Sequence, residues 1–148
     1  MKWLSISATN RNYLFLALSL FLSSETSLAD SLKIVDGDTL VLDGVVFRLN
    51  GIDAPEIAQE CSKDGLAWKC GIDAANALKS VAINVSCDKH QKDQYDRWIG
   101  TCRNGKGAEL NAWMVENGWA IAYVDYSDAY LPEQQSAKEQ GLGIWASK

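Results

Sequence analysis

Short runs of apolar and β-branched residues follow one another along the chain after residue 30, separated by polar or glycine-containing turns. Runs of this length and composition predict β-strands. Asp43-Gly44 lies between two of them and is typical of a hairpin turn, because both residues tolerate positive φ. The expected strands are Leu32–Val35, Thr39–Leu42, Val45–Leu49, Ala82–Cys87, Trp98–Arg103 and Trp119–Val124, with a loop at Asn50–Glu60.

Three other segments are predicted to be helices, the first two from apolar residues at helical spacing and the third as a polar helix that Pro132 opens. They are Gly71–Val81, Leu110–Asn117 and Pro132–Gln140, and a glycine follows each of the last two. Several short strands with a few helices predict a small barrel rather than a layered βαβ fold. The apolar faces expected to be buried are Ile72, Ala75, Leu78 and Val81 in the first helix, and Leu110, Trp113 and Met114 in the second.

The N-terminal segment is predicted to be an export signal rather than part of the fold. Lys2 and Arg11 precede an apolar run, Tyr13 to Leu22, which as a helix would rise about 15 Å, too short to span a bilayer. Small residues at Ser27 and Ala29 suit a signal peptidase. We expect a signal peptide at 1–29, cut after Ala29, and one secreted or periplasmic domain at 30–148 without a membrane anchor; an uncleaved anchor is the alternative.

Composition narrows the choice of function. The chain has 148 residues, of which 47% are hydrophobic, and this is the composition of one globular domain. Its formal net charge of −5 argues against a protein that binds nucleic acid through bulk positive charge. Contact with a polyanion would therefore depend on a few well-placed cations, together with a metal ion.

Four cysteines follow the predicted cut, and an even number in an exported chain of this size indicates two disulfides. Three connectivities are possible. We favour Cys61–Cys70, which closes a short loop, and Cys87–Cys102, which would join two strands across the polar stretch 88–97. The rival is a four-cysteine zinc site, but the spacings do not match those of a zinc knuckle.

Acidic residues and arginines gather around the first predicted hairpin. Asp38 precedes it, Arg48 lies on its second strand, Asp53 and Glu56 follow it, and Arg97 comes later in the polar stretch. Phosphodiester hydrolysis suits this set: two carboxylates can hold a hard cation, a third can orient or deprotonate water, and arginines can bind phosphate. Each residue also has a plainer interpretation as a turn residue or a solvated strand residue, so spacing alone indicates a metal site without a substrate.

Five strings occur here in an order that resembles the staphylococcal nuclease (thermonuclease-like) family: IVDGDTLVL, FRLNGIDAPE, QYDRWIG, GWAIAYV and GLGIWASK. The similarity extends from about Lys33 to Ala146, and the four cysteines resemble the family's exported bacterial branch. The resemblance implies an α+β, mainly β fold: a five-stranded OB-fold barrel with about three packed helices. It also implies a Ca2+-dependent endonuclease that hydrolyses DNA and RNA and leaves 3′-phosphate ends.

The same resemblance implies a role for each matching residue. Asp38, Asp53 and the backbone carbonyl of Ala54 would bind the calcium ion. Glu56 would orient or activate water, and Arg48 and Arg97 would bind the phosphate, all three as catalytic residues. Tyr95 and Tyr123 match positions that contact the terminal phosphate and stack on a base.

The chain departs from the family pattern near the substrate. Asp96 stands directly before Arg97 where glycine is common, Gln94 replaces a frequent basic residue, and Asp125 occupies an often aromatic position. Asp96 could pair with Arg97 and compete with phosphate, or occupy a positive φ at some cost. We therefore expect weak affinity for polyanions, and a higher kcat/KM for Asp96→Gly.

Two classes of function remain open. The first is a secreted nuclease, a monomer whose partners are its DNA and RNA substrates and which has no stable protein partner. The alternative is a catalytically weak or inactive OB-fold module that binds nucleic acid or an oligosaccharide. A disulfide-stabilised structural protein with an incidental calcium site is a third interpretation, but it does not require two phosphate-binding arginines. His90, the one histidine, is expected to be a loop residue.

Overall fold

A five-stranded mixed sheet forms the body of the protein, for which a computed structural model describes residues 31–146. The strand order is β1-β2-β3-β8-β7, with β3 and β8 parallel and the other neighbours antiparallel. The fold class implied by the resemblance is confirmed, although this pairing is a linear order and not a closed ring. The strands are β1 (Leu32–Ile34), β2 (Thr39–Leu42), β3 (Val45–Leu49), β7 (Ser86–Lys92) and β8 (Trp98–Arg103).

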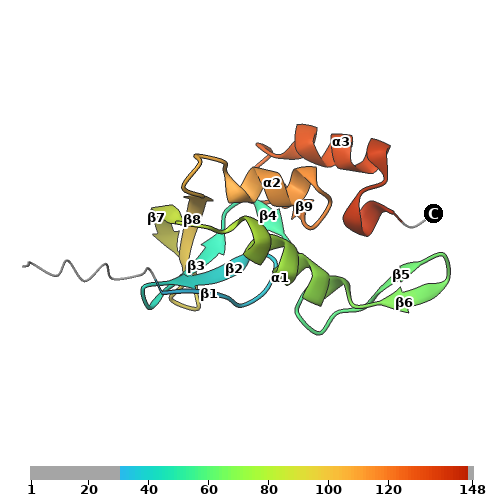
Figure 1. Ribbon diagram of the computed structural model, residues 1–148. Helices are drawn as coiled ribbons and strands as arrows, with labels where there is room; N and C mark the ends of the chain where they lie inside the picture. The colour runs from blue at the N-terminus through green and yellow to red at the C-terminus, as the bar shows by residue number, and fades with distance from the viewer. Residues whose placement is uncertain (1–30, 147–148) are drawn as a thin grey trace, which may run out of the picture.

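Two short strand pairs lie outside this sheet. β4 (Ile52–Asp53) pairs with β9 (Ile121–Ala122), and β5 (Cys61–Lys63) pairs with β6 (Leu66–Trp68). The β5–β6 hairpin projects from the rest of the molecule beyond the start of α1 (Figure 1). β4 lies inside the segment expected to be a loop, and β9 occupies only the middle of the longer strand expected there, so both expectations were partly wrong.

Three helices lie close to where they were predicted: α1 (Cys70–Val81), α2 (Leu110–Glu116) and α3 (Leu131–Gln140). α1 and α2 pack against the sheet and each other, and α3 packs against α2 and β9. A 3-10 turn, η1 (Gly143–Trp145), follows. The buried face of α1 differs from the prediction, because Ile72 is 39% exposed whereas Cys70, Ala74 and Leu78 are fully buried. The start of the helix is turned so that its small residues, not Ile72, face the neighbouring turns.

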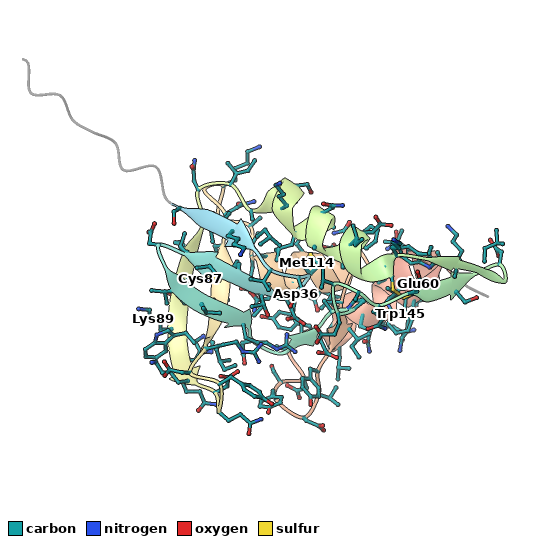
Figure 2. The ribbon with its side chains drawn as sticks, turned by 90° about the horizontal axis from the view of Figure 1, so that it is seen from below. Asp36, Glu60, Cys87, Lys89, Met114 and Trp145 are labelled. Atoms are coloured by element: carbon teal, nitrogen blue, oxygen red, sulfur yellow. A yellow bond between two sulfur atoms is a disulfide. The ribbon has the colours of Figure 1, made fainter. Side chains whose placement is uncertain are left out.

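The prediction for β7 was wrong at both ends. The chain turns at Asn84, whose φ is 51°, and the strand begins only at Ser86 and continues through polar residues to Lys92. Nearly all of its side chains are exposed, so no apolar pattern marks it. Backbone pairing with β8 forms this edge strand, and Figure 2 shows Lys89 on it, at the opposite end of the molecule from Glu60 and Trp145.

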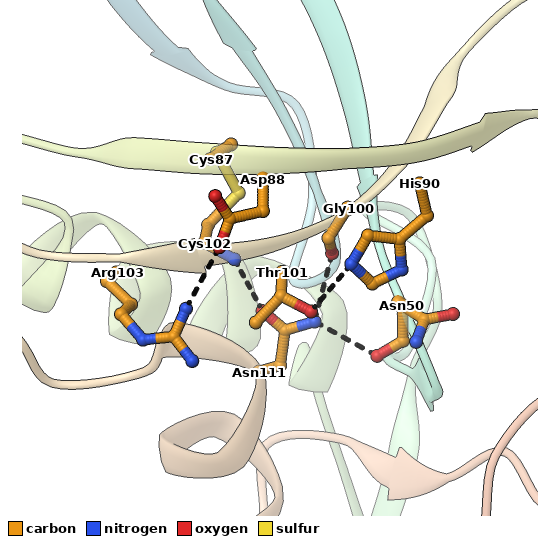
Figure 3. The surroundings of a disulfide bond; sticks show 9 residues. All are labelled: Asn50, Cys87, Asp88, His90, Gly100, Thr101, Cys102, Arg103 and Asn111. Carbon is orange, nitrogen blue, oxygen red and sulfur yellow. Dashed lines mark hydrogen bonds and ion pairs between the residues drawn. A yellow bond between two sulfur atoms is a disulfide. The ribbon is translucent and has the colours of Figure 1, made fainter.

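Both predicted disulfides are confirmed. Cys61 is bonded to Cys70 at the start of α1, and Cys87 is bonded to Cys102 directly opposite it in the β7–β8 pairing (Figure 3). The predicted signal peptide lies outside the described residues. Within the residues that are described, no helix is both long and apolar enough to cross a membrane.

Candidate functional site

The turn Asp36-Gly37-Asp38 between β1 and β2 places one carboxylate inside the protein. Asp38 is 6% exposed; its Oδ2 accepts a hydrogen bond from the Ala54 N–H at 2.8 Å, and its Oδ1 accepts one from the Thr39 hydroxyl at 3.0 Å. A Cβ on Gly37 would lie 2.7 Å from that of Ala54. Glycine therefore allows the turn to lie against the segment that follows β4.

Arg48, on β3, joins the two predicted calcium-binding aspartates. Its guanidinium forms an ion pair with Asp38, and its Nη2 donates to Oδ1 of Asp53 at 2.7 Å. Burial raises the pKa of Asp38 to about 6, although the charge of Arg48 and the Ala54 N–H oppose the rise. Arg48 thus offsets only part of the free-energy cost of burying a negative charge on Asp38.

A cleft of about 480 Å³ lies beside these residues. Arg48 and Asp53 line it from the sheet side, and Arg97 lines it from the β7–β8 turn. The predicted substrate-binding residues Tyr95 and Tyr123 line it as well. The structure therefore brings five of the predicted residues to one cavity, with Asp38 and Ala54 buried directly behind Arg48 and Asp53.

Glu56 does not line this cleft. Its side chain is exposed, three residues beyond Asp53, and its backbone N–H donates to Oε1 of Gln59 at 3.2 Å. The predicted water-activating residue is thus near the predicted metal-binding aspartates along the chain, but its carboxylate is not part of the cavity wall.

Arg97 is held by Asp93, a residue that the sequence analysis did not single out. Oδ2 of Asp93 accepts from Nε of Arg97 at 2.8 Å, and its Oδ1 accepts from the Arg97 backbone N–H at 3.0 Å. Burial alone would raise the pKa of Asp93, but the hydrogen bonds from Arg97 and from the Tyr95 N–H lower it. The available sequence signal was that Asp93 stands four residues before Arg97, just before a predicted strand.

The expectation that Asp96 pairs with Arg97 was wrong. Asp96 accepts from Nζ of Lys92 at 2.5 Å, so Lys92 pairs with this carboxylate instead of Arg97. The second expectation is confirmed: Asp96 has a φ of 65°, in the left-handed region that favours glycine.

One aromatic residue besides Tyr95 and Tyr123 lines the cleft. Tyr126 lines it beside Tyr123, with their ring centroids 4.9 Å apart. Tyr130 does not line the cleft; its hydroxyl donates to Glu109 at 2.6 Å, and its ring packs against Gly51. His90 lies on strand β7 and not in a loop, so that expectation was wrong. It is also outside the cleft, with Nε2 3.3 Å from the hydroxyl of Thr101.

Asn111, on α2, is a buried polar residue that the sequence analysis missed. Its Oδ1 accepts from the Cys102 N–H at 3.1 Å, and its Nδ2 donates to the carbonyls of Asn50 at 3.0 Å and Gly100 at 3.2 Å (Figure 3). These bonds fix the Asn50–Gly51 wall of the cleft to β8. An asparagine among apolar helical residues was the only sequence signal.

The donor set suits a hard cation. Within residues 31–146, no group of three His, Cys, Asp or Glu side chains is arranged as a metal site. The predicted set instead consists of two carboxylates and one carbonyl, from Asp38, Asp53 and Ala54, and all of its donors are oxygens, as Ca2+ prefers. The raised pKa of buried Asp38 indicates a place where further positive charge would be stabilising. These oxygen donors therefore fit a hard divalent cation such as Ca2+.

Comparison with known proteins gives a consistent family. A family model described as staphylococcal nuclease homologue matches residues 46–147. The chain is 36% identical over 121 residues to the succinoglycan biosynthesis protein ExoI of Rhizobium meliloti, covering 78% of this chain but 63% of ExoI. It is 33% identical over 122 residues to an uncharacterized endonuclease of Escherichia coli O157:H7, covering 77% of this chain and 74% of the relative. Endonuclease YhcR of Bacillus subtilis is 31% identical over 132 residues, which make up 11% of its length.

Proposed function

This chain belongs to the staphylococcal nuclease family, and from that premise we propose that it is a calcium-dependent endonuclease of the thermonuclease type. It hydrolyses phosphodiester bonds in DNA and RNA and leaves 3′-phosphate ends. The observation that carries the proposal is the cleft in which Arg48, Arg97 and Asp53 meet, because two arginines and a carboxylate suit a bound phosphodiester. The relatives named endonuclease support it.

The arginines bind and orient the scissile phosphate. The Nε of Arg97 is occupied by Asp93, which leaves the two terminal nitrogens of its guanidinium for phosphate oxygens. Arg48 already lies between two carboxylates, and a phosphate in the cleft would accept from the edge of the same guanidinium. Tyr95 and Tyr123, which both line the cleft, would contact the terminal phosphate and a base.

The acids act on the metal side of the phosphate. A calcium ion held by Asp38, Asp53 and the carbonyl of Ala54 would supply a Lewis acid that polarises a phosphoryl oxygen. Glu56 orients the attacking water or accepts its proton, and the exposed position of its side chain gives it access to water.

The location and state of the protein belong to the same proposal. A signal peptide at 1–29 would direct one domain, 30–148, to the periplasm or the exterior, where both disulfides are stable. The protein would act as a monomer without a stable protein partner.

The test is digestion of heat-denatured DNA and of RNA by the purified protein, with calcium and with a chelator, beside Glu56→Ser. Calcium-dependent cleavage that the variant loses, with 3′-phosphate ends on the products, is the expected result. Calcium binding by the variant, measured by titration calorimetry, should stay close to that of the wild type.

One observation favours a second candidate, the binding module. Arg48 occupies both aspartates and Glu56 lies outside the cleft wall, which is also how a cleft that binds without cleaving would look. The similarity to a protein named for succinoglycan biosynthesis makes an oligosaccharide the ligand to try beside nucleic acid. Binding without cleavage, across divalent ions and at low salt, would establish this candidate instead.

A further inference from the structure

The turn that carries Glu56 is closed by two hydrogen bonds with Gln59. The Glu56 N–H donates to Oε1 of Gln59 at 3.2 Å, and the Gln59 N–H donates to the carbonyl of Glu56 at 2.8 Å. The bonds run in opposite directions and close residues 56–59 into one ring. Because the Glu56 side chain is exposed, the direction of its carboxylate depends on the backbone that this ring holds.

The ring is fastened to the first turn of α1. The Gly71 N–H donates to the carbonyl of Gln59 at 3.3 Å, and a Cβ on Gly71 would lie only 1.8 Å from the Glu56 carbonyl oxygen. The helix backbone therefore lies directly against Glu56, an approach that only glycine allows. Cys70, fully buried beside Gly71, is tied by its disulfide to Cys61, two residues after Gln59.

The same helix supports the turn that carries Asp38. A Cβ on Gly37 would lie 2.9 Å from Cβ of Ala74, one turn further along α1 than Gly71. α1 is thus a common support for both turns, and a residue that fixes the Glu56 turn on α1 also fixes Glu56 relative to Asp38.

We propose that Gln59 is a positioning residue for Glu56, acting with Gly71 and the Cys61–Cys70 disulfide to hold the Glu56 backbone on α1. The inference rests on the proposed nuclease function for its chemical consequence. Without the Gln59 side chain, the Glu56 N–H loses its acceptor, and the carboxylate samples directions that do not serve the attacking water. Misplacement of a catalytic group by about 1 Å can cost up to about 100-fold in rate.

The main test is Gln59→Ala, compared with Gln135→Ala, which removes an exposed glutamine from α3. We expect kcat of Gln59→Ala to fall about tenfold with KM unchanged, since the cleft residues that bind substrate are untouched. Combining Gln59→Ala with Glu56→Ser should cost nothing beyond Glu56→Ser alone, because the two residues act as one unit. A loss that persists in the Glu56→Ser background, or one no larger than that of Gln135→Ala, would overturn the proposal.

Two further measurements separate this proposal from the proposed function. Gln59→Glu keeps an oxygen acceptor for the Glu56 N–H and should recover part of the lost kcat. Hydrogen exchange of the Glu56 amide needs no activity, and we expect it to be faster in Gln59→Ala than in the wild type. If the wild type does not cleave nucleic acid, the nuclease function fails, while faster exchange would still support the role of Gln59. Unchanged exchange would refute that role in either case.

Discussion

The two sides of the cleft differ in how firmly they are held. On the sheet side, Asp38 is 6% exposed, and Arg48 joins it to Asp53. On the opposite side, Tyr95 is 70% exposed and Tyr126 is 64% exposed. Only the sheet side is built into the core, so changes there should affect both the fold and the chemistry. Changes on the opposite side, the rim that carries Tyr95 and Tyr126, should affect substrate binding and catalysis with little effect on the fold.

The largest effect is expected from removing the buried carboxylate. Asp38→Asn keeps an oxygen for the Ala54 N–H and has nearly the same volume, so we expect the protein to fold. It loses the charge that a calcium ion requires, and cleavage should fall by orders of magnitude. Calcium titration calorimetry and a thermal melt would measure both effects. Wild-type calcium affinity in this variant would remove Asp38 from the metal site.

Replacing Arg48 and replacing Arg97 should lower stability by different amounts but activity by similar amounts. Arg48→Gln leaves Asp38 buried without its ion pair, so we expect a loss of about 3 kcal/mol in the free energy of unfolding. Arg97 is more exposed, and Arg97→Gln should cost less than about 0.5 kcal/mol. Both should lower kcat about 100-fold or more, as expected when a group that stabilises transition-state charge is removed. Urea unfolding with parallel kinetics tests the difference; equal destabilisation by the two variants would contradict it.

Removing the Cys87–Cys102 disulfide should lower the stability of the protein without changing the chemistry on either side of the cleft. It joins β7 to β8, and none of the cleft-lining residues belongs to it. Replacing both cysteines with serine should cost about 2–4 kcal/mol in the free energy of unfolding. Below the new Tm, kcat and KM should both remain near wild type. A Tm that responds neither to this change nor to a reductant would count against the bond.

A smaller effect is expected from Asp93, which holds Arg97 without being part of the core. Asp93→Asn weakens two hydrogen bonds to Arg97, so we expect kcat/KM to fall severalfold while Tm changes little. Asp88→Asn is the matched control, since Asp88 pairs with Arg103 outside the cleft. The assignment fails if the two variants have the same kcat/KM.

The sequence could predict the parts of the fold that bury apolar side chains. β2, β3 and β8 begin and end at the expected residues, because buried strands require the β-branched and apolar runs that mark them. β7 could not be found in this way, since it is an exposed edge strand that is held mainly by backbone pairing with β8. The exposure of Ile72 likewise depends on how α1 packs, which spacing alone does not determine.

For the candidate site, the sequence predicted five residues that line the cleft, but not how they are paired and not that Glu56 lies outside the cleft wall. Motif order was enough to bring Arg48, Asp53 and Arg97 to one cleft. It could not show that Arg48 joins the two aspartates, or that Asp93 rather than Asp96 is the partner of Arg97. Only the second of these pairings lies in the turn before β8, where Asp93 accepts from both the backbone N–H and the Nε of Arg97. Asp96, in the same turn, has a positive φ and pairs with Lys92 instead.

The smallest effect, and the sharpest test of the rim, is expected from Asp96→Gly. Asp96 is exposed, adopts a φ of 65° and pairs with Lys92, so its removal relieves the backbone and frees a lysine near the cleft. It also deletes a negative charge next to Arg97, and we expect kcat/KM to rise a few-fold at low salt, mainly through a lower KM. Asp96→Asn removes the charge but keeps the side chain. If kcat/KM rises equally in both variants, the charge of Asp96 limits substrate binding at the rim. If kcat/KM rises only in Asp96→Gly, the backbone conformation of the turn limits it. An unchanged or lower kcat/KM in both would mean that the rim charge does not limit substrate binding.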